Sequence, residues 1–399
     1  SWCCMSADDE LGIVYVPLGS PTSAYYGGHR PGDNLFANSL VALDAETGER
    51  IWHFQMIHHD LWEYDNGSPP ILGDITVNGR TIKAVMQANK NGFVYVFDRT
   101  NGEPVWPIVE TPVPQSTVEG EATSATQPIP SKPPAFDRQG ITLDDLIEFT
   151  PALHNQALEL IDNFTLGPLY TPPSPWIEEG NQGTLTVPST WGAGNWNTGA
   201  FDPETGMYFA VSYTKAGNLG IALTTSDSAT MTHTIAQGSP SAPTIQGLPL
   251  TKPPYGRVTA LNMNTGELEW SVANGDGPRD HPLLRNLNLP PLGIPNRPAP
   301  LVTKSLLFVG EGSDAVVGTV PGGGGSYDGA DTGYDESWRW GTLFRAFDKS
   351  SGDTVFEIDL SAGTTGAPMT YMHEGKQYIV VAVSSRATDP EWIALGLSK

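Results

Sequence analysis

One eleven-residue pattern recurs along the chain and constrains its fold more than any other feature of the sequence. The pattern joins the end of an apolar segment to an Asp or Asn, a turn ending in Gly, and a terminal aromatic residue. The copies are 42–52 (ALDAETGERIW), 96–106 (VFDRTNGEPVW), 260–270 (ALNMNTGELEW), a worn copy at 346–356 (AFDKSSGDTVF) and a shorter one at 201–206 (FDPETG). Such self-similarity indicates a repeat architecture.

Each copy predicts two antiparallel strands joined by a tight turn, with its Gly at a positive φ. We expect the terminal Trp to pack against the neighbouring unit. Strands predicted at 13–16, 306–309 and 378–383 fall where a four-stranded unit needs them. Modules of about 50 residues, with one weak copy skipped, favour an all-β fold, a β-propeller of about five to six blades, over two β-sandwich domains.

One region interrupts the repeats. The segment from 107 to about 175 is rich in Pro, and it contains apolar residues at near-helical spacing between 142 and 164. We expect a single helix there, within a long excursion over the face of the propeller, and we treat 1–399 as one partial propeller domain.

The charge balance excludes one class of partner. The 399 residues include 44 acidic and 21 basic side chains, for a net charge of −23. Nucleic-acid binding needs clustered Lys and Arg, so we expect no nucleic-acid partner. The longest aliphatic stretch, 378–383, is far shorter than the roughly 20 residues that span a bilayer.

The start of the chain gives little information. It begins Ser1-Trp2-Cys3-Cys4 without an initiator Met or an apolar leader, so we expect a mature chain or a fragment that opens inside a folded unit. The adjacent cysteines form either a strained disulfide ring or, as we favour, two small buried thiols.

Three polar segments could carry chemistry, and each also has a structural interpretation. His and carboxylates at 57–65 could bind a metal or supply a general base, or could tie down a loop. Lys90, in segment 87–93, would usually be a surface charge, but it lies at the junction of two apolar strands. Trp and Asn at 190–198 could stack on a flat aromatic ligand, or could line the junction between two units.

Several motifs together resemble the quinoprotein dehydrogenases that use pyrroloquinoline quinone (PQQ), especially the membrane-bound glucose and quinate dehydrogenase branch. They are the Trp-ended repeat, similar to that family's tryptophan-docking motif, and the segments YGGHR (26–30), HHDLW (58–62), NGFVYVFDR (91–99), YTPPS (170–174), GAPMTY (366–371) and GKQY (375–378). The resemblance covers nearly the whole chain. It implies an eight-bladed propeller with the quinone on its axis, of which this chain lacks the first few blades.

The resemblance also implies roles for individual residues. Trp2 is similar to the tryptophan that forms one wall of the quinone's stacking sandwich, and Asn195 and Trp196 resemble an Asn-Trp pair at the far rim of the cofactor. Glu63 lies where the family has its catalytic Asp. Lys90 matches the Lys or Arg that hydrogen-bonds the reactive carbonyl oxygen.

The metal ligands implied by the resemblance are less regular. Ca²⁺ or another divalent cation is expected near Ser20, Glu63 and Asp65. Ser20 stands where alcohol-oxidising members have a calcium-binding Asn, and Asp65 where some relatives add a rare-earth ligand. Glu63 is one methylene longer than the family's Asp, which could displace the base by about an ångström and lower the rate about a hundredfold.

By this resemblance the chain is an oxidoreductase that oxidises a hydroxyl of a sugar, cyclic polyol or alcohol. Glu63, held ionised by a nearby cation, takes the hydroxyl proton, and electrons pass through the quinone to ubiquinone or a cytochrome. A periplasmic location is implied, with membrane attachment only through sequence upstream of this chain. The alternatives are a non-catalytic propeller scaffold, since fold does not fix function, and a hydrolase using Asp60 and Glu63.

Overall fold

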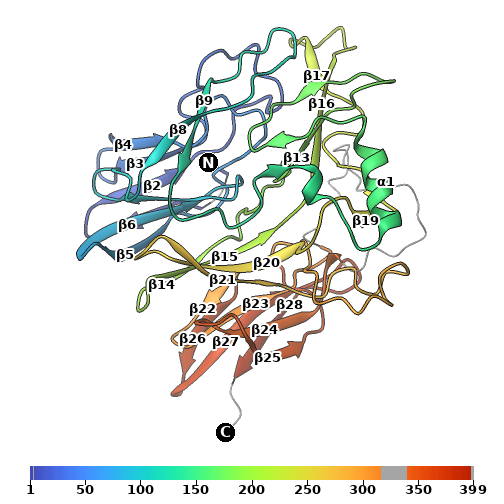
Figure 1. Cartoon of the computed structure of the whole chain (residues 1–399). Coiled ribbons are helices and arrows are strands. Elements are labelled where there is room, and N and C mark those ends of the chain that lie inside the picture. Colours follow the sequence, from blue (N-terminus) through green and yellow to red (C-terminus); the bar gives the residue numbers. More distant parts are fainter. Residues whose placement is uncertain (3, 316–338, 397–399) are drawn as a thin grey trace.

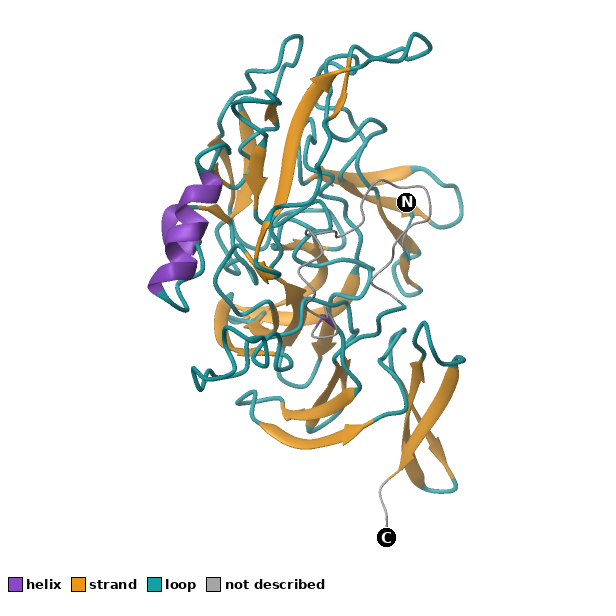
Figure 2. Ribbon diagram, turned by 90° about the vertical axis from the view of Figure 1, so that its right-hand side faces the viewer, coloured by secondary structure: helices purple, strands orange, loops and turns teal. Residues whose placement is uncertain are grey.

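Antiparallel β-structure dominates the computed structural model, which describes residues 1–2, 4–315 and 339–396. The predicted all-β propeller class is confirmed, while the number of blades stays a prediction. Figure 2 shows one prominent helix at the periphery of the strands. It is α1 (Pro151–Ile161), and a 3₁₀ turn, η1 (Leu143–Asp145), precedes it.

Five antiparallel sheets follow one another along the chain, each with its strands in chain order. The first contains β1 (Ser6–Asp8), β2 (Ile13–Pro17), β3 (Ser39–Asp44) and β4 (Arg50–Gln55). The second contains β5 (Ile71–Val77), β6 (Arg80–Ala88) and β7 (Val94–Asp98). The third contains β14 (Ala200–Asp202), β15 (Met207–Tyr213), β20 (Gly256–Asn262) and β21 (Glu267–Ala273). The fourth contains β22 (Leu301–Val302), β23 (Leu306–Gly310), β24 (Leu343–Asp348) and β25 (Thr354–Asp359). The fifth contains β26 (Met369–His373), β27 (Lys376–Val383) and β28 (Glu391–Gly396).

The repeated turns have the predicted backbone. Gly48, Gly102, Gly266 and Gly352 all have φ between 70° and 79°, a region that side chains with a Cβ rarely adopt. The strand register shifts at the same point of the repeat in the first, third and fourth sheets. The shift lies between Ala42 and Leu43, between Ala260 and Leu261, and between Ala346 and Phe347.

The short copy at 201–206 is not a separate unit. It forms the turn between β14 and β15, and the copy at 260–270 forms the turn between β20 and β21 of the same sheet. The two turns contact each other, because the amide of Met263 donates to the carbonyl of Gly206 at 2.8 Å.

The Trp that ends a repeat packs on the turn of the next sheet, as predicted. The indole N–H of Trp52 donates to the carbonyl of Arg99 at 3.2 Å. A Cβ on Gly102 would lie 2.6 Å from the Trp52 ring, so only Gly fits beneath it. Trp270 donates in the same way to the carbonyl of Lys349 at 3.2 Å. The other close approaches of this kind join Trp106 to Gly266 and Trp270 to Gly352.

Apolar side chains fill the spaces between successive sheets. Tyr15 and Trp52 of the first sheet pack with Phe97 of the second, and Trp270 of the third packs with Phe347 of the fourth. In Figure 1 the sheets accordingly run in sequence order from the blue strands to the red ones. Burial of aromatic and aliphatic surface between sheets is thus the main stabilising contribution.

Irregular segments and short strands are inserted between the second and third sheets and, within the third sheet, between β15 and β20. The inserted strands are β8 (Ile108–Pro112), β9 (Thr126–Pro130), β10 (Gly140–Ile141), β11 (Gly167–Pro168), β12 (Ser174–Pro175), β13 (Thr184–Thr186), β16 (Gly217–Leu223), β17 (His233–Ile235), β18 (Thr244–Ile245) and β19 (Leu248–Pro249). Strands β12, β13 and β17 all pair with β16 to form a further sheet, which Figure 1 shows beside the helix.

The predicted helix at 142–164 is wrong in extent. Helix α1 begins only at Pro151, and Thr150 before it is extended and accepts a hydrogen bond from the amide of Leu153 at 3.2 Å. A Pro disfavours helical backbone in the residue before it, and it fits the first helical position. The apolar residues before Pro151 therefore have helical spacing without helical backbone.

The fifth sheet exposes large apolar side chains, with Trp392 75% and Met372 66% exposed. Within the described residues, no helix is both long and apolar enough to cross a membrane. Cys4 is exposed, contrary to our expectation of a buried thiol, and Cys3 lies outside the described residues.

Candidate active site

A cavity of about 690 Å³ collects residues from seven separate segments of the chain. We call it the main cavity. Its lining comprises Trp2, Ser20, Pro21, Thr22, Ser23, Ala24, Tyr25, Glu63, Asp65, Lys90, Thr190, Trp191, Asn195, Pro240 and Arg297. Six of the seven predicted site residues are among them. The seventh, Trp196, is not part of this lining, although its amide donates to Asn195 Oδ1 at 2.8 Å.

A tightly hydrogen-bonded loop carries the two cavity carboxylates. Its anchor is Asp60, which is only 1% exposed and accepts hydrogen bonds from the amides of Trp62 and Tyr64 at 2.8 and 2.9 Å. Burial raises the pKa of Asp60, while hydrogen bonds from Ser20, Trp62 and Asn38 oppose the rise. Glu63 itself has φ of 60°, an uncommon backbone conformation for a residue with a side chain, and the turn directs it and Asp65 to the cavity.

Asp65 and Lys90 form a buried ion pair at the wall of the main cavity. Lys90 Nζ lies 2.6 Å from Asp65 Oδ2, and the amide of Ser20 donates to Asp65 Oδ1 at 2.6 Å. Burial alone would raise the pKa of Asp65, but Lys90 and the Ser20 hydrogen bond outweigh it and lower that pKa. The carboxylate is therefore ionised, and its partner amine is fixed beside the cavity.

Trp2 presents a flat ring beside this pair. Lys90 Nζ lies 5.9 Å from the centre of the Trp2 ring. Two glycines leave room for the indole, since a Cβ on Gly19 would lie 3.2 Å from Trp2 Cδ1 and one on Gly67 would lie 3.0 Å from Trp2 Cζ2. Trp2 is 54% exposed, so its face is available to a planar molecule.

Glu63 is held by a tyrosine that sequence reasoning did not single out. The Tyr25 hydroxyl donates to Glu63 Oε2 at 2.8 Å. We expected a nearby cation to keep Glu63 ionised. In the structure burial raises the pKa of Glu63, and Lys90 and Tyr25 only partly offset that rise. A carboxyl with a raised pKa is a better proton acceptor once it is ionised.

The two histidines before this loop bind protein groups. His59 Nε2 lies 2.9 Å from Glu121 Oε1, and its Nδ1 lies 2.7 Å from the carbonyl of Gly32. His58 Nε2 lies 3.1 Å from Glu110 Oε1. Of the two interpretations of this segment, the histidines therefore fit the one in which they tie down a loop.

No group of three or more His, Cys, Asp or Glu side chains converges as a metal-ligand set in the part of the chain that the structure describes. The Ser20 hydroxyl donates to Asp60, and Asp65 is paired with Lys90. Glu63 and Asp65 nevertheless line the same cavity, and hard cations prefer such oxygen donors. The predicted metal ligands thus remain a prediction.

Sequence reasoning missed Arg297 as a residue of the main cavity. Its guanidinium carbon lies 4.4 Å from the centre of the Trp191 ring, and its Nε donates to the Tyr213 hydroxyl at 3.1 Å. Arg297 comes from a Pro-rich segment without a repeat, so no pattern linked it to the cavity. Trp191, in contrast, lies in the Trp- and Asn-rich segment that we considered for ligand stacking.

The comparisons with known proteins agree with the resemblance. The protein-family model described as "PQQ: Glucose/ethanol/alcohol dehydrogenase, beta-propeller domain" matches residues 1–325 and 337–379. The chain belongs to this PQQ-dependent dehydrogenase family. The quinoprotein glucose dehydrogenase of Escherichia coli is 30% identical over 420 residues, covering 97% of this chain and 47% of the relative. The quinate/shikimate dehydrogenase (quinone) of Acinetobacter baylyi is 30% identical over 417 residues, covering 98% and 47%.

Solved structures of two alcohol-oxidising dehydrogenases share the fold. The quinohemoprotein alcohol dehydrogenase of Comamonas testosteroni has a TM-score of 0.60 at 22% identity, covering 98% of this chain and 47% of the other. A europium-containing methanol dehydrogenase has a TM-score of 0.54 at 17% identity, covering 96% and 51%. The chain thus spans about half the length of the relatives it matches.

The main cavity of this PQQ-family chain offers the family's cofactor a flat stacking surface together with charged groups of both signs, since Glu63 and Asp65 line it beside Lys90 and Arg297. PQQ is a planar quinone with several carboxylates. The Trp2 indole offers a stacking face, and Lys90, Asn195 and Arg297 place cationic and amide groups around the same space. Gly19 and Gly67 make room for the indole, so the backbone around Trp2 fixes the position of this stacking surface.

Proposed function

We propose that this chain carries the PQQ site and the catalytic groups of a dehydrogenase that oxidises the CH–OH group of a sugar, cyclic polyol or alcohol. The observation that carries the proposal is that Trp2, Glu63 and Lys90 line one cavity although they are far apart in the sequence. Had the fold separated them, no small planar ligand could have touched all three.

Each residue has a distinct task in this proposal. Trp2 holds the flat face of the cofactor, and Lys90 donates hydrogen bonds to it from beside the ring. PQQ, when bound, supplies the two-electron acceptor. Glu63 accepts the proton of the substrate hydroxyl, and the Tyr25 hydrogen bond to Oε2 fixes the orientation of its carboxyl group.

The cation, the electron acceptor and the location are also proposals. Glu63 and Asp65 contribute negative charge to the cavity, and Ca²⁺ or another divalent cation near them and Ser20 would reduce the cost of their burial. Electrons pass to ubiquinone or a cytochrome, and the protein acts in the periplasm, attached to the inner membrane. Relatives named as glucose, quinate/shikimate and glycerol dehydrogenases support the substrate class.

A binding experiment with one matched variant tests the proposal. We expect PQQ with Ca²⁺ to quench the tryptophan fluorescence of the chain saturably, with one molecule bound per chain. Trp2→Ala should weaken PQQ binding about tenfold because the stacking surface is lost. The control Trp392→Ala removes an exposed indole of the fifth sheet and should leave the affinity unchanged.

Oxidation of glucose, quinate, glycerol and ethanol is then followed with a redox dye. We expect dye reduction with at least one of these substrates, and only when PQQ is present. A non-catalytic scaffold would neither bind PQQ saturably nor reduce the dye, and either failure would count against the proposal.

The hydrogen bond from Tyr25 predicts a change in pH dependence. Glu63 is active only when ionised, and the Tyr25 hydroxyl favours that ionised form. Tyr25→Phe should therefore raise the pKa of Glu63, so that the rising limb of kcat/KM against pH moves to higher pH while the rate recovers in alkaline buffer.

The neighbouring residue provides the control for this variant. The Tyr26 hydroxyl donates to the carbonyl of Glu119 rather than to Glu63. Tyr26→Phe should leave the pH profile in place. Equal profiles for Tyr25→Phe and the unaltered chain would show that Tyr25 does not act on the base.

A further inference from the structure

A second cavity, of about 330 Å³, adjoins the main cavity, and we call it the side cavity. Trp191 and Arg297 line both cavities. The guanidinium of Arg297 lies over the rings of Trp191 and Tyr213, at 4.4 and 5.7 Å from their centres, and the Tyr213 hydroxyl donates to the carbonyl of Trp191 at 2.5 Å. These three linked side chains therefore form a wall between two adjacent spaces.

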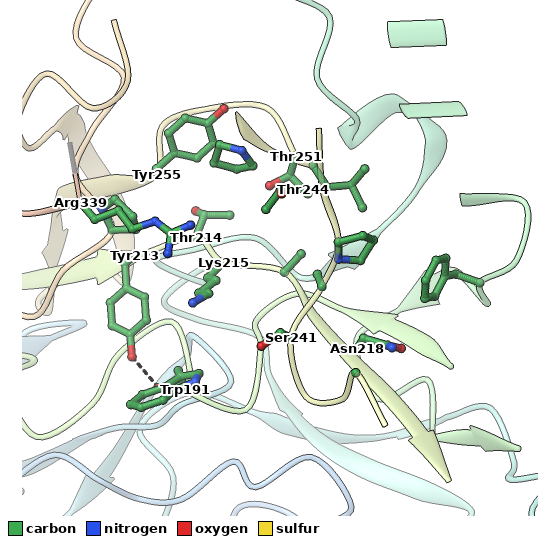
Figure 3. A pocket seen from close by; sticks show the side chains of 18 of the residues that line it. Trp191, Tyr213, Thr214, Lys215, Asn218, Ser241, Thr244, Thr251, Tyr255 and Arg339 are labelled. Atoms are coloured by element: carbon green, nitrogen blue, oxygen red, sulfur yellow. Dashed lines mark hydrogen bonds between the residues drawn. The ribbon is translucent and has the colours of Figure 1, made fainter. Parts of the chain in front are cut away.

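The charge of the side cavity is opposite to that of the chain as a whole. The charged side chains among its described lining residues are Lys215, Arg297 and Arg339, and none of those residues is Asp or Glu. Acidic residues outnumber basic ones 44 to 21 in the sequence, so a cavity whose charged side chains are all basic departs from the composition of the chain. In Figure 3, Arg339 and Lys215 lie on the side of the cavity where Tyr213 and Trp191 lie, opposite Asn218.

The rest of the lining is largely apolar. It includes Phe164 and Trp176, and also Ala242 and Leu250 from the strand-and-loop segment around β18 and β19. The volume falls within the range of small-molecule sites, in which apolar walls bind the body of a ligand and a few polar groups set its orientation.

We propose that the side cavity binds an organic anion with a flat or compact apolar body, such as an aromatic carboxylate. The anionic group would face the basic side, where Arg339, Lys215 and Arg297 lie, and the body would contact the apolar residues. Because the Trp191–Arg297 wall separates the cavities, this ligand and PQQ bind at the same time, each in its own cavity. The anion site does not depend on the dehydrogenase activity.

The probe is 2-naphthoate, with its uncharged amide and acetate as matched controls, and binding to the full chain is measured by calorimetry. We expect one saturable site for 2-naphthoate, at least about tenfold weaker binding of the amide, and no measurable binding of acetate. Equal affinity for the acid and the amide would overturn the proposal, because it would show that the basic residues are not used.

Variants then locate the site. Lys215→Met should weaken 2-naphthoate binding about tenfold, and Ala242→Phe, which fills the cavity, should abolish it. Lys304→Met removes an exposed lysine outside the cavity and should change nothing. The proposal is wrong if 2-naphthoate competes with PQQ for one site, or if Trp2→Ala weakens its binding as much as Lys215→Met does. Loss of PQQ binding alone would instead count only against the proposed cofactor site.

Discussion

Glu63→Gln is expected to lower kcat at least about a hundredfold while leaving the affinity for PQQ unchanged. The amide keeps the size of the side chain, and its oxygen still accepts the hydrogen bond that the Tyr25 hydroxyl donates to Oε2 at 2.8 Å. It has no ionised oxygen to take a proton, however, so only the proton-transfer step is lost. The measurement is dye-linked turnover at saturating PQQ, combined with a fluorescence titration of PQQ.

Two further variants separate the role of Glu63 from a general effect of charge. Glu110→Gln makes the same change at a half-exposed carboxylate that pairs with His58 outside the main cavity, and it should retain full activity. Glu63→Asp keeps a carboxylate but shortens it, so it should be more active than Glu63→Gln although it loses contact with Tyr25. Undiminished turnover in Glu63→Gln would remove Glu63 from the mechanism.

The Glu at position 63 has a structural explanation in this chain. Sequence reasoning treated its extra methylene as a displacement of the base. In the structure that length allows the carboxyl group to reach the Tyr25 hydroxyl, which comes from a different loop. Tyr25 and Glu63 are 38 positions apart, and a contact over that distance leaves no periodic pattern in the sequence. The hydrogen bond that accommodates the longer side chain of Glu63 could therefore not be predicted from the sequence.

The repeated sheets were predictable because their determinants are local. Alternating apolar residues, an Asp or Asn and a Gly at positive φ specify each hairpin within eleven residues, and the terminal Trp specifies its neighbour. The same argument failed at 201–206, where the turn motif occurs a second time within the third sheet. A motif of six residues identifies a turn, but it does not say how many turns a sheet contains.

The inserted regions were less predictable, because their contacts join segments distant in sequence. Strand β16 pairs with both β13 and β17, and α1 stops short of the predicted helix because Pro151 fixes its start. The residues of the main cavity likewise divide into those that a motif predicted and those that no motif predicted. Lys90 and Trp2 were found through the family resemblance, whereas Arg297 enters the cavity from a segment with no motif of its own.

Lys90→Met is expected to destabilise the chain by about 3–5 kcal/mol at pH 7, because it leaves the Asp65 carboxylate buried without its partner. Asp65 is 7% exposed, and Lys90 lies 2.6 Å from its Oδ2. The variant should also lose PQQ affinity and turnover, since the amine beside Trp2 is gone. Urea unfolding measures the loss of stability. The surface control is Lys132→Met, which breaks an exposed pair with Glu267 and should change stability little.

The pH dependence and a double variant identify the cause of this loss. In the unaltered chain the pKa of Asp65 is lowered below 3.8, so its ionised form stabilises the fold above that pH, and the stabilisation disappears as the pH falls through the folded-state pKa. Without Lys90, burial should raise that pKa, so the stability difference between the two chains should shrink as the pH falls toward and below 3.8.

Asp65→Asn added to Lys90→Met removes the unpaired charge and keeps an acceptor for the amide of Ser20. The double variant should recover most of the stability at pH 7 but none of the turnover. If it stays as unstable as Lys90→Met, the loss comes from packing around the lysine stem, and the ion pair is not what holds this wall of the cavity.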